Sequence, residues 1–469
     1  MGIMKKNDGP DRLTKRAVIA RIVESHLATP ILYTDACSWY SWNEKHWELE
    51  RDKSAVGIQR LLLDANCHYL AALSNEADKE LRACCLKLDD SPNALVNLAK
   101  TLSAVACSND QFDRQPYLFY CANGTLDLRN GQLAAHSRND FLTRISPIGY
   151  DPAATCPRFD RFLWETFDGD QELIEYVVRM LGYCLTGDTS EQKFWIWYGP
   201  AGQNGKSVLA NIVRELLGHD YASEVSPKTL CGSEKQIPND IARLGKCRFL
   251  SCREPDLEAR LNESLLKSLV GQDIVVARFL FKEFFEFRPQ FKLLMQTNHL
   301  PRANASSDAI WRRIRVIPFN VRVADRDRKK NLARELVESE GPGILSRLVR
   351  GAMEHYKHGL SEPVAVTKAT AAYREAQRLL DGISNTDSTC GQHFIVTHVQ
   401  PSSGHVVTKA ELYQAYEEHC RENGVVPVSE KAFGMAMKRA GYEHPHVQNF
   451  RVRQEDGEMA RAWYGAKVA

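Results

Sequence analysis

Gly205, Lys206 and Ser207 are residues whose types and spacing point directly to chemistry. They follow the dense apolar run 193–199 and open the amphipathic segment 206–218, so we expect a buried strand before them and a helix after them. Backbone N–H groups at such a helix N-terminus hold phosphate oxygens, and the helix dipole favours their charge. The lysine would reach the β- and γ-phosphates, and the serine hydroxyl would ligate Mg²⁺. The pattern predicts a nucleotide-binding loop.

The glycine spacing departs from the usual G-x-x-x-x-G-K-[ST] pattern, because the first glycine stands at Gly199, one residue too early. We predict that Gly202 to Ser207 wrap the phosphates and that residues 199–201 bulge outward at the entrance. Asn204 and the glycines make left-handed backbone conformations accessible there. A glycine-rich turn without a ligand is the alternative, and the correct flanks on both sides argue against it.

An acidic partner must hold the metal through water and polarise the attacking water. Glu254 and Asp256 follow the apolar run 247–252, and Glu254 is our choice. A solvated charge after a strand is the alternative. Asn298 ends the next apolar run, where such a residue senses the γ-phosphate in ATPases of this layout; taken alone, it reads better as a turn former before Pro301.

Arginines are concentrated beside the apolar run 314–319, at Arg312, Arg313 and Arg315. An arginine offered to the nucleotide of a neighbouring subunit would stabilise charge in the transition state. Surface arginines on an edge strand are the simpler explanation.

Alternation of expected strands and helices after residue 190 predicts an α/β domain with a largely parallel sheet to position these side chains. We expect further strands at 246–252, 275–298 and 310–319, and a helix at 257–271. Upstream, the patterns predict helices within 12–27, 53–107 and 157–187, with short strands within 31–50 and 117–136. Beyond residue 324 the chain reads as helical, and the last 65 residues read as helix, turn, helix and a strand pair.

Composition is that of an ordinary globular protein, with 43% hydrophobic and 26% charged residues and a net charge of +2. The 13 cysteines are scattered without a C-x-x-C pair, which favours reduced thiols in a cytoplasm. No signal-like apolar core or membrane-length apolar run occurs, so neither secretion nor membrane insertion is expected.

The ordered set of motifs resembles the superfamily 3 helicases, and specifically the helicase portion of phage and plasmid primase-helicases, which are related to the poxvirus primase-helicase. The set comprises, in order, "NGKS", "REPD", "ARLNESLLKSLVGQD", "ARFLFKEFFEFRP", "KLLMQTNHLP" and "DAIWRRIRVIPF". The resemblance covers roughly residues 115 to 445. Beyond NGKS, each motif is weak individually and specific only as a member of the set.

The resemblance implies an AAA+-like P-loop ATPase with a mostly parallel sheet. A mainly helical collar with short strands would precede it, and a helical segment and a winged helix would follow. The implied division is an N-terminal accessory region, the collar, the ATPase core, a helical lid or linker and the winged-helix domain, at residues 1–110, 111–188, 189–324, 325–385 and 386–469. Too few residues precede the collar for a primase fold, so a primase or polymerase is expected as a separate partner.

Family roles then transfer residue by residue. ATP with Mg²⁺ would bind at Gly202, Asn204, Gly205, Lys206 and Ser207. Glu254 would match the second-motif acid, Asn298 the sensor, and Arg312 or Arg313 the finger acting across a subunit boundary. The segment 271–287 matches a hairpin that grips one DNA strand in a central channel, with Arg278 and Lys282 as its basic residues and Phe279 and Phe281 between them. Simple core packing is the better explanation for the phenylalanines.

The implied activity is unwinding of duplex DNA by a ring-shaped homo-oligomer, a hexamer moving 3′ to 5′, in the cytoplasm of a bacterial host of a phage, plasmid or mobile element. Single-stranded or forked DNA is the implied partner. Two other classes stay open. One is an origin-binding initiator that uses ATP as an assembly switch with little unwinding. The other is an ATPase that remodels or loads proteins.

Basic residues also cluster near the C-terminus. Lys431, Lys438 and Arg439 fall on an expected helix after the turn at 423–424, as in a DNA-recognition helix. Arg451, Arg453 and Arg461 would lie on the wing. A winged helix that binds protein is the alternative.

Overall fold

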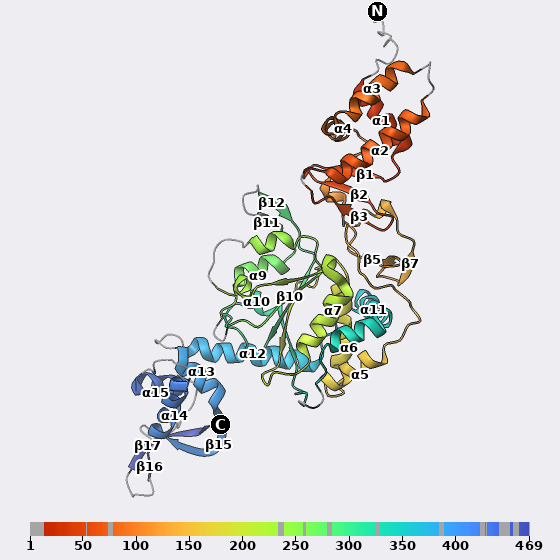
Figure 1. Cartoon of the computed structure of the whole chain (residues 1–469). Helices are drawn as coiled ribbons and strands as arrows, with labels where there is room; N and C mark the ends of the chain where they lie inside the picture. The colour runs from red at the N-terminus through yellow and green to blue at the C-terminus, as the bar shows by residue number, and fades with distance from the viewer. Residues whose placement is uncertain are drawn as a thin grey trace, which may run out of the picture.

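The computed structural model describes residues 14–469 except 53, 74–77, 233–238, 257–258, 279–283, 325, 327, 384–388, 423–426, 428, 440–450, 454–458 and 469. The described chain is elongated (Figure 1). An N-terminal part lies at one end, a central body carries the largest sheet, and a C-terminal part lies at the other end.

The N-terminal part combines four helices with a four-stranded sheet of order β3-β2-β1-β4. The helices are α1 (Lys15–His26), α2 (Val56–Ala72), α3 (Lys79–Asp89) and α4 (Pro92–Ala99). The strands are β1 (Ile31–Thr34), β2 (Trp39–Trp42), β3 (Trp47–Leu49) and β4 (Ala106–Cys107). Apolar helix faces share one core with Ile31 and Trp39 of the sheet. Trp47 joins this part to the next, because its indole Nε1–H donates to the Arg138 carbonyl at 2.9 Å.

The following segment holds an antiparallel three-stranded sheet and two helices. The strands are β5 (Leu118–Cys121), β6 (Gly124–Asp127) and β7 (Gln132–Ala134), and the helices are α5 (Pro157–Thr166) and α6 (Gln171–Leu185). Helix α6 lies within the helical region expected at 157–187, and it buries an apolar stripe of Leu173, Ile174, Val177, Val178 and Leu181. It packs in one core with α11 (Leu332–His358), far along the chain.

The central body confirms the expected α/β layout with a parallel sheet. Its order is β14-β8-β13-β10-β9, and every neighbouring pair is parallel. The strands are β8 (Phe194–Tyr198), β9 (Ala222–Val225), β10 (Phe249–Cys252), β13 (Lys292–Thr297) and β14 (Ile314–Pro318). Helices α7 (Lys206–Tyr221), α8 (Pro227–Leu230), α9 (Glu263–Val270) and α10 (Asp308–Trp311) join them. Since parallel strands end at one edge, the residues after β8, β10 and β13 meet there.

Two expected helices differ in extent. Among the described residues, the helix expected at 257–271 is present only as α9, because the Leu261 N–H donates to the Arg302 carbonyl at 2.8 Å and the Asn262 side chain caps the helix start. The helix after the glycine-rich loop is traced to Tyr221, but Gly218 interrupts it with φ 69°. The helical backbone therefore breaks at the glycine where the sequence pattern ends.

A two-stranded hairpin projects from the central body, formed by β11 (Val275–Arg278) and β12 (Phe284–Phe287) in antiparallel pairing. Its inner face packs on the core through Val275 and Phe287. Three 3₁₀ turns, at Asn109–Gln111, Arg138–Asp140 and Asn239–Arg243, complete these parts.

The C-terminal part begins with α12 (Val364–Ile383), which packs against β14. The Val316 N–H donates to Thr370 Oγ1 at 3.0 Å, and the rings of Trp311 and Tyr373 lie 4.9 Å apart. Helices α13 (Thr389–His398), α14 (Lys409–Glu422) and α15 (Glu430–Arg439) follow, with a sheet of order β15-β17-β16. Its strands are β15 (Val399–Thr408), β16 (Arg451–Arg453) and β17 (Met459–Val468).

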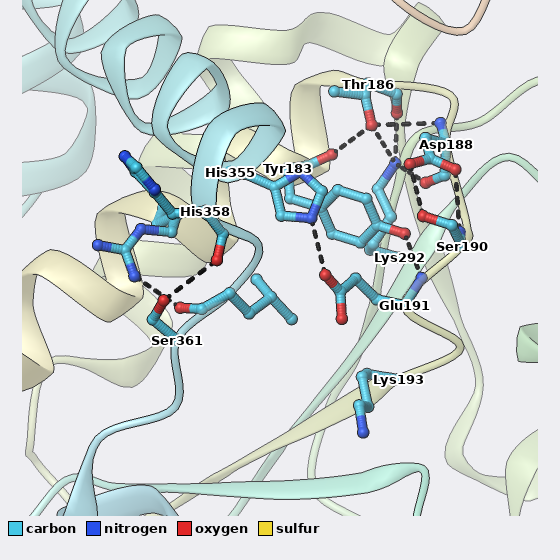
Figure 2. A network of polar contacts seen from close by, with 12 residues as sticks. Tyr183, Thr186, Asp188, Ser190, Glu191, Lys193, Lys292, His355, His358 and Ser361 are labelled. Carbon is cyan, nitrogen blue, oxygen red and sulfur yellow. Dashed lines mark hydrogen bonds and ion pairs between the residues drawn. The ribbon is translucent and has the colours of Figure 1, made fainter.

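Two buried cations, Arg248 and Lys292, lie at the beginnings of strands β10 and β13. Lys292, the first residue of β13, donates to the carbonyls of Thr186, Asp188 and Gln290, and its ammonium lies 4.8 Å from the centre of the Tyr183 ring (Figure 2). Arg248, just before β10, donates to the carbonyls of Leu185 and Leu118, each at 2.6 Å. Both cations thereby fasten the sheet to the segment that carries α6.

Candidate nucleotide site

The loop between β8 and α7 has the backbone that a phosphate wrap requires. Gly202, Gln203 and Gly205 all have positive φ, at 64°, 50° and 81°. A Cβ atom on Gly205 would also lie 3.1 Å from Thr166 Oγ1, because α5 presses against the loop. Glycine is therefore favoured at position 205 by its left-handed backbone and by the close approach of Thr166.

The structural role of Gly199 differs from that of the first glycine in the usual phosphate-loop motif. It is buried, and a Cβ there would lie 1.8 Å from Asn204 Nδ2 and 2.8 Å from Lys206 Nζ. Its carbonyl accepts a hydrogen bond from the Lys206 ammonium at 3.1 Å. Pro200 and Ala201 are exposed, and the cavity wall is formed by Gly202 to Val208.

Lys206 is buried, and its ammonium donates three hydrogen bonds. Besides the Gly199 carbonyl, its ammonium donates to Asn204 Oδ1 at 2.9 Å and to Asn298 Oδ1 at 2.8 Å. Asn204 is itself fixed, because its Nδ2 donates to the Phe319 carbonyl at 3.2 Å. Burial lowers the pKa of Lys206 to about 8, and the nearby Glu254 carboxylate opposes that shift. A lysine with this pKa still carries its proton for the most part at pH 7.

Glu254 and Asn298 are paired at the ends of neighbouring strands β10 and β13. The Asn298 backbone N–H donates to Glu254 Oε1 and its Nδ2 donates to Oε2, each at 2.8 Å. Asn298 therefore links the Lys206 ammonium to the Glu254 carboxylate through one amide group. The structure thus brings together Glu254 and Asn298, which follow strands β10 and β13, with Lys206, the first residue of α7, although Lys206 and Asn298 are 92 residues apart in the chain.

A cavity of about 520 Å³ opens over these groups. Its wall includes the loop residues 202–207, Glu254 and Asn298. Helix α5 contributes Phe162, Glu165 and Thr166, so the segment before the sheet also forms part of the site.

The wall also holds cations that the sequence reading left out, namely Arg253, Arg328 and Lys329. Arg253 pairs with Glu224 of β9 at 2.7 Å. Arg328 and Lys329 belong to the basic run 326–330, which could have been noticed as a charge cluster following the last strand. Only the fold brings Arg328 and Lys329 to the same cavity as the glycine-rich loop.

The donor set fits Mg²⁺ bound together with phosphates. Ser207 is exposed to the cavity and Glu254 supplies the carboxylate, and Mg²⁺ usually takes one or two carboxylates plus substrate oxygens. No cluster of three or more His, Cys, Asp or Glu suited to a metal occurs among the described residues. Any metal here would depend on the nucleotide for most of its ligands.

Arg312 and Arg313 do not line this cavity. Arg312 is exposed, whereas Arg313 is 8% exposed and donates from Nη1 to the Ala309 carbonyl at 2.7 Å. Burial lowers the pKa of Arg313, with the Arg312 charge acting in the same direction. Of the two, Arg312 is the one a second molecule could reach.

The candidate DNA-contacting hairpin is described in part. Arg278 is exposed, and its guanidinium lies 4.9 Å from the centre of the Phe284 ring. Phe284, which is 64% exposed, is an aromatic residue that the sequence reading did not single out. Lys282, Phe279 and Phe281 lie outside the described residues.

On α15, Lys431 and Lys438 are exposed. The side chains of Arg439, Arg451, Arg453 and Arg461 lie outside the described part of the structure.

Two family models match the chain. "D5 N terminal like" matches residues 20–168, across the expected boundary at 110, and a family of unknown function matches residues 197–313. None of the helices in the described residues is long and apolar enough to span a membrane.

Curated relatives come from viruses. A "putative helicase" of Acanthamoeba polyphaga mimivirus is 26% identical over 387 residues, covering 77% of this chain and 37% of the relative. A "putative helicase" of frog virus 3 (isolate Goorha) is 32% identical over 280 residues, covering 45% and 29%. A "putative primase" of African swine fever virus is 25% identical over 214 residues, covering 43% and 22%. The chain thus spans about a third or less of the length of these relatives.

Among solved structures, the apo C-terminal region of NrS-1 aligns over 97% of this chain and 100% of that chain, at 12% identity and a TM-score of 0.47. The D5-type N-terminal match and the helicase- and primase-named relatives agree with the resemblance carried by the motifs. The chain therefore carries a D5 N-terminal-like region at residues 20–168 and is similar to the helicase- and primase-named proteins of large DNA viruses.

Proposed function

We propose that this chain is an ATP-driven helicase that unwinds duplex DNA during replication of a phage, plasmid or other mobile genetic element, with single-stranded or forked DNA as its partner. The observation that carries the proposal is the hydrogen-bonded path from Lys206 through Asn298 to Glu254 beneath a phosphate-binding backbone. The helicase names of the viral relatives support the class of activity.

In the proposed reaction, the backbone N–H groups of residues 202–207 and the Lys206 ammonium hold the phosphates of ATP. Glu254 orients the attacking water and accepts its proton. When bound, Mg²⁺ would neutralise phosphate charge, held by the Ser207 hydroxyl and, through water, by Glu254.

Asn298 is well placed to act as the sensor. Its Oδ1 accepts from Lys206, while its two N–H groups hold both oxygens of Glu254. A γ-phosphate that binds Lys206 competes for the ammonium now shared with Asn298. Phosphate binding would thereby change the hydrogen bonding of the catalytic carboxylate.

The wider proposal is an AAA+-like, superfamily 3 ATPase that forms a homohexameric ring and moves 3′ to 5′, with the C-terminal part as a winged helix. Placement of β13 between β8 and β10 supports it, because a sensor strand then lies between the phosphate-loop strand and the acid strand. The exposed Arg312 would complete the ATP site of a neighbouring subunit. The division at residues 1–110, 111–188, 189–324, 325–385 and 386–469 belongs to the same proposal.

Strand displacement on a forked duplex tests the proposal. We expect the wild-type chain to unwind the fork with ATP and Mg²⁺, and Lys206→Ala to abolish unwinding and ATP hydrolysis, because the phosphates lose their buried cation. Lys357→Ala, on the exposed surface of α11, is the matched control and should unwind normally. Robust unwinding by Lys206→Ala would refute the nucleotide-site assignment.

Strand displacement, measured together with DNA binding and ATP hydrolysis, also distinguishes the two alternative functions. An origin-binding initiator would assemble on duplex DNA with ATP and displace no strand. A protein-remodelling or loading ATPase would hydrolyse ATP at a rate that neither single-stranded nor forked DNA changes.

A further inference from the structure

A second cavity, of about 1140 Å³, lies where the N-terminal sheet meets the base of the β11–β12 hairpin. One wall is the β2–β3 region, including His46 to Arg51, and another is the segment 108–114 that follows β4. The central body supplies residues 242–246 and 285–290. In Figure 1 the hairpin and the N-terminal sheet lie on the same side of the central body. The nucleotide cavity shares no wall residue with this cleft.

Cations outnumber anions along the cleft. Six basic side chains line it, from Arg51, Arg114, Arg144, Arg243, Lys246 and Arg288, against four acidic ones, from Glu48, Asp110, Asp113 and Glu286. Asp113 is not available to repel a ligand, because it is buried and accepts hydrogen bonds from the Thr143 N–H at 2.8 Å and hydroxyl at 2.6 Å. Burial alone would raise the pKa of Asp113, but Lys246 and Thr143 hold it below its ordinary value.

Arg51, Arg114 and Arg288 are exposed and come from three different walls. Arg51 follows β3, Arg114 follows the 3₁₀ turn after β4, and Arg288 follows β12. None of the three makes an ion pair with another residue in the part of the chain that the structure describes. Their charges are therefore available to a ligand that spans the cleft.

Apolar surface lies between these charges. Leu49, at 43% exposed, and Ile274, at 51% exposed, stand on opposite walls. Phe285 and Phe287 of β12, whose rings are 6.0 Å apart, are half-buried on the hairpin side. The cleft therefore offers an apolar surface for flat apolar groups as well as positive charges for anionic groups.

We infer that this cleft binds a single strand of DNA, with phosphates against Arg51, Arg114 and Arg288 and bases against Leu49, Ile274 and the hairpin phenylalanines. A single strand combines regularly spaced phosphates with flat bases that stack on apolar and aromatic side chains, which matches the mixed lining. An acidic peptide would match the charges but would leave the apolar surface uncovered. The inference rests on the proposed function in taking DNA as the substrate, and it adds a binding surface contributed by the N-terminal part.

Fluorescence anisotropy of a labelled oligo(dT), with the full chain and without nucleotide, tests the inference over a series of salt concentrations. In the triple variant Arg51→Ala, Arg114→Ala, Arg288→Ala we expect roughly tenfold or greater weakening, and a decrease of about 2 in the slope of log K against log salt, since each phosphate contact contributes about 0.7 for single strands. The triple variant Arg21→Ala, Arg60→Ala, Arg334→Ala removes three exposed arginines elsewhere and should keep wild-type affinity and slope. Basal ATP hydrolysis without DNA should be unchanged, because none of the cleft arginines lines the nucleotide cavity.

Charge-conserving replacement of Arg51, Arg114 and Arg288 by lysine should restore most of the affinity, because a phosphate contact needs the positive charge. Polyglutamate should fail to displace the oligonucleotide. Wild-type affinity and slope in the alanine triple variant, an equal loss in the control triple variant, no rescue by lysine, or displacement by polyglutamate would each overturn the inference. Failure of the proposed function would show separately, as unwinding by Lys206→Ala with cleft binding unchanged.

Discussion

At the scale of single residues, the candidate site is one continuous set of hydrogen bonds. Lys206 has three oxygen partners, one of which is the amide of Asn298, and that amide also holds Glu254. The lysine is buried among neutral acceptors, so an anionic ligand would stabilise its charge more than these partners do. The arrangement makes the acid and the phosphate-binding cation depend on one another.

This dependence predicts different outcomes for two substitutions. Glu254→Gln should retain ATP binding while reducing kcat for hydrolysis by about 10²–10⁴-fold, because the amide keeps the shape but cannot accept the proton from water. Lys206→Ala should instead abolish nucleotide binding. Binding of a fluorescent ATP analogue, measured beside single-turnover hydrolysis, distinguishes the two variants. Glu254→Gln with wild-type hydrolysis would remove this residue from the catalytic role.

At the scale of elements, the strands that carry Glu254 and Asn298 are each anchored at the end away from the site. Arg248 before β10 and Lys292 at the start of β13 both donate to carbonyls of the segment that contains α6. Around Lys292, Figure 2 shows Asp188, Glu191 and His355 in the same network, with His355 Nε2 and Glu191 Oε1 3.0 Å apart. The buried ammonium is held by carbonyls and a ring face rather than by a carboxylate.

The Lys292 anchor predicts a pH dependence of stability. Burial lowers the pKa of Lys292 from 10.5 to about 7, so between about pH 7 and 10.5 the unfolded chain binds more protons at this lysine than the folded chain. The contribution of Lys292 to stability should therefore rise with pH in that window and be lost as pH falls toward 7. We expect the Tm of the wild type relative to Lys292→Met to increase between pH 6.5 and 9.

Lys357→Met is the matched control, because this exposed lysine is solvated in both states. Its Tm difference from the wild type should stay constant across the same range. An equally constant difference for Lys292→Met would contradict the assigned titration.

At the scale of the whole molecule, the described chain holds a candidate nucleotide cavity assembled from several parts of the sequence. Helix α5 comes before the sheet in the sequence, Arg328 and Lys329 come after it, and all three contribute to the cavity wall. Arg312 is exposed and lies outside the cavity. In the proposed ring, a neighbouring subunit would present Arg312 to this cavity. Arg313, buried within its own chain, would support the local fold instead.

Mixing two inactive variants tests the shared site. Arg312→Ala and Lys206→Ala should each lack ATP hydrolysis, but mixed rings contain sites that pair an intact Lys206 with an intact neighbouring Arg312. Random equal mixing should restore about a quarter of wild-type hydrolysis, because a site needs both partners in the correct order. Arg313→Ala should lower Tm in the unmixed protein. No recovery on mixing would argue against Arg312 as the shared residue.

Local sequence pattern alone predicted the glycine-rich loop, the elements on either side of it and the α/β class of the fold. The apolar run 193–199, the glycine-rich loop and the helix at 206 are contiguous, so local propensity and spacing predict them, and the parallel α/β layout follows from their alternation. The shorter α9 could not be read locally, because the hydrogen bond from Leu261 to Arg302 competes with helix formation. Local pattern likewise gave no sign that Arg312 is exposed and Arg313 buried, since burial depends on what packs over each side chain.

Only the tertiary structure decided which distant groups share the site. The joining of Lys206, Asn298 and Glu254 depends on the order of strands β8, β13 and β10, which sequence spacing does not fix. The same holds for Phe162, for Arg328 and Lys329, and for the basic cleft at the N-terminal sheet, whose residues come from segments over 200 positions apart. The chemistry of each side chain can be read from the sequence, because it depends only on the residue type. Proximity across a sheet or between parts of the molecule arises instead from packing of the whole chain.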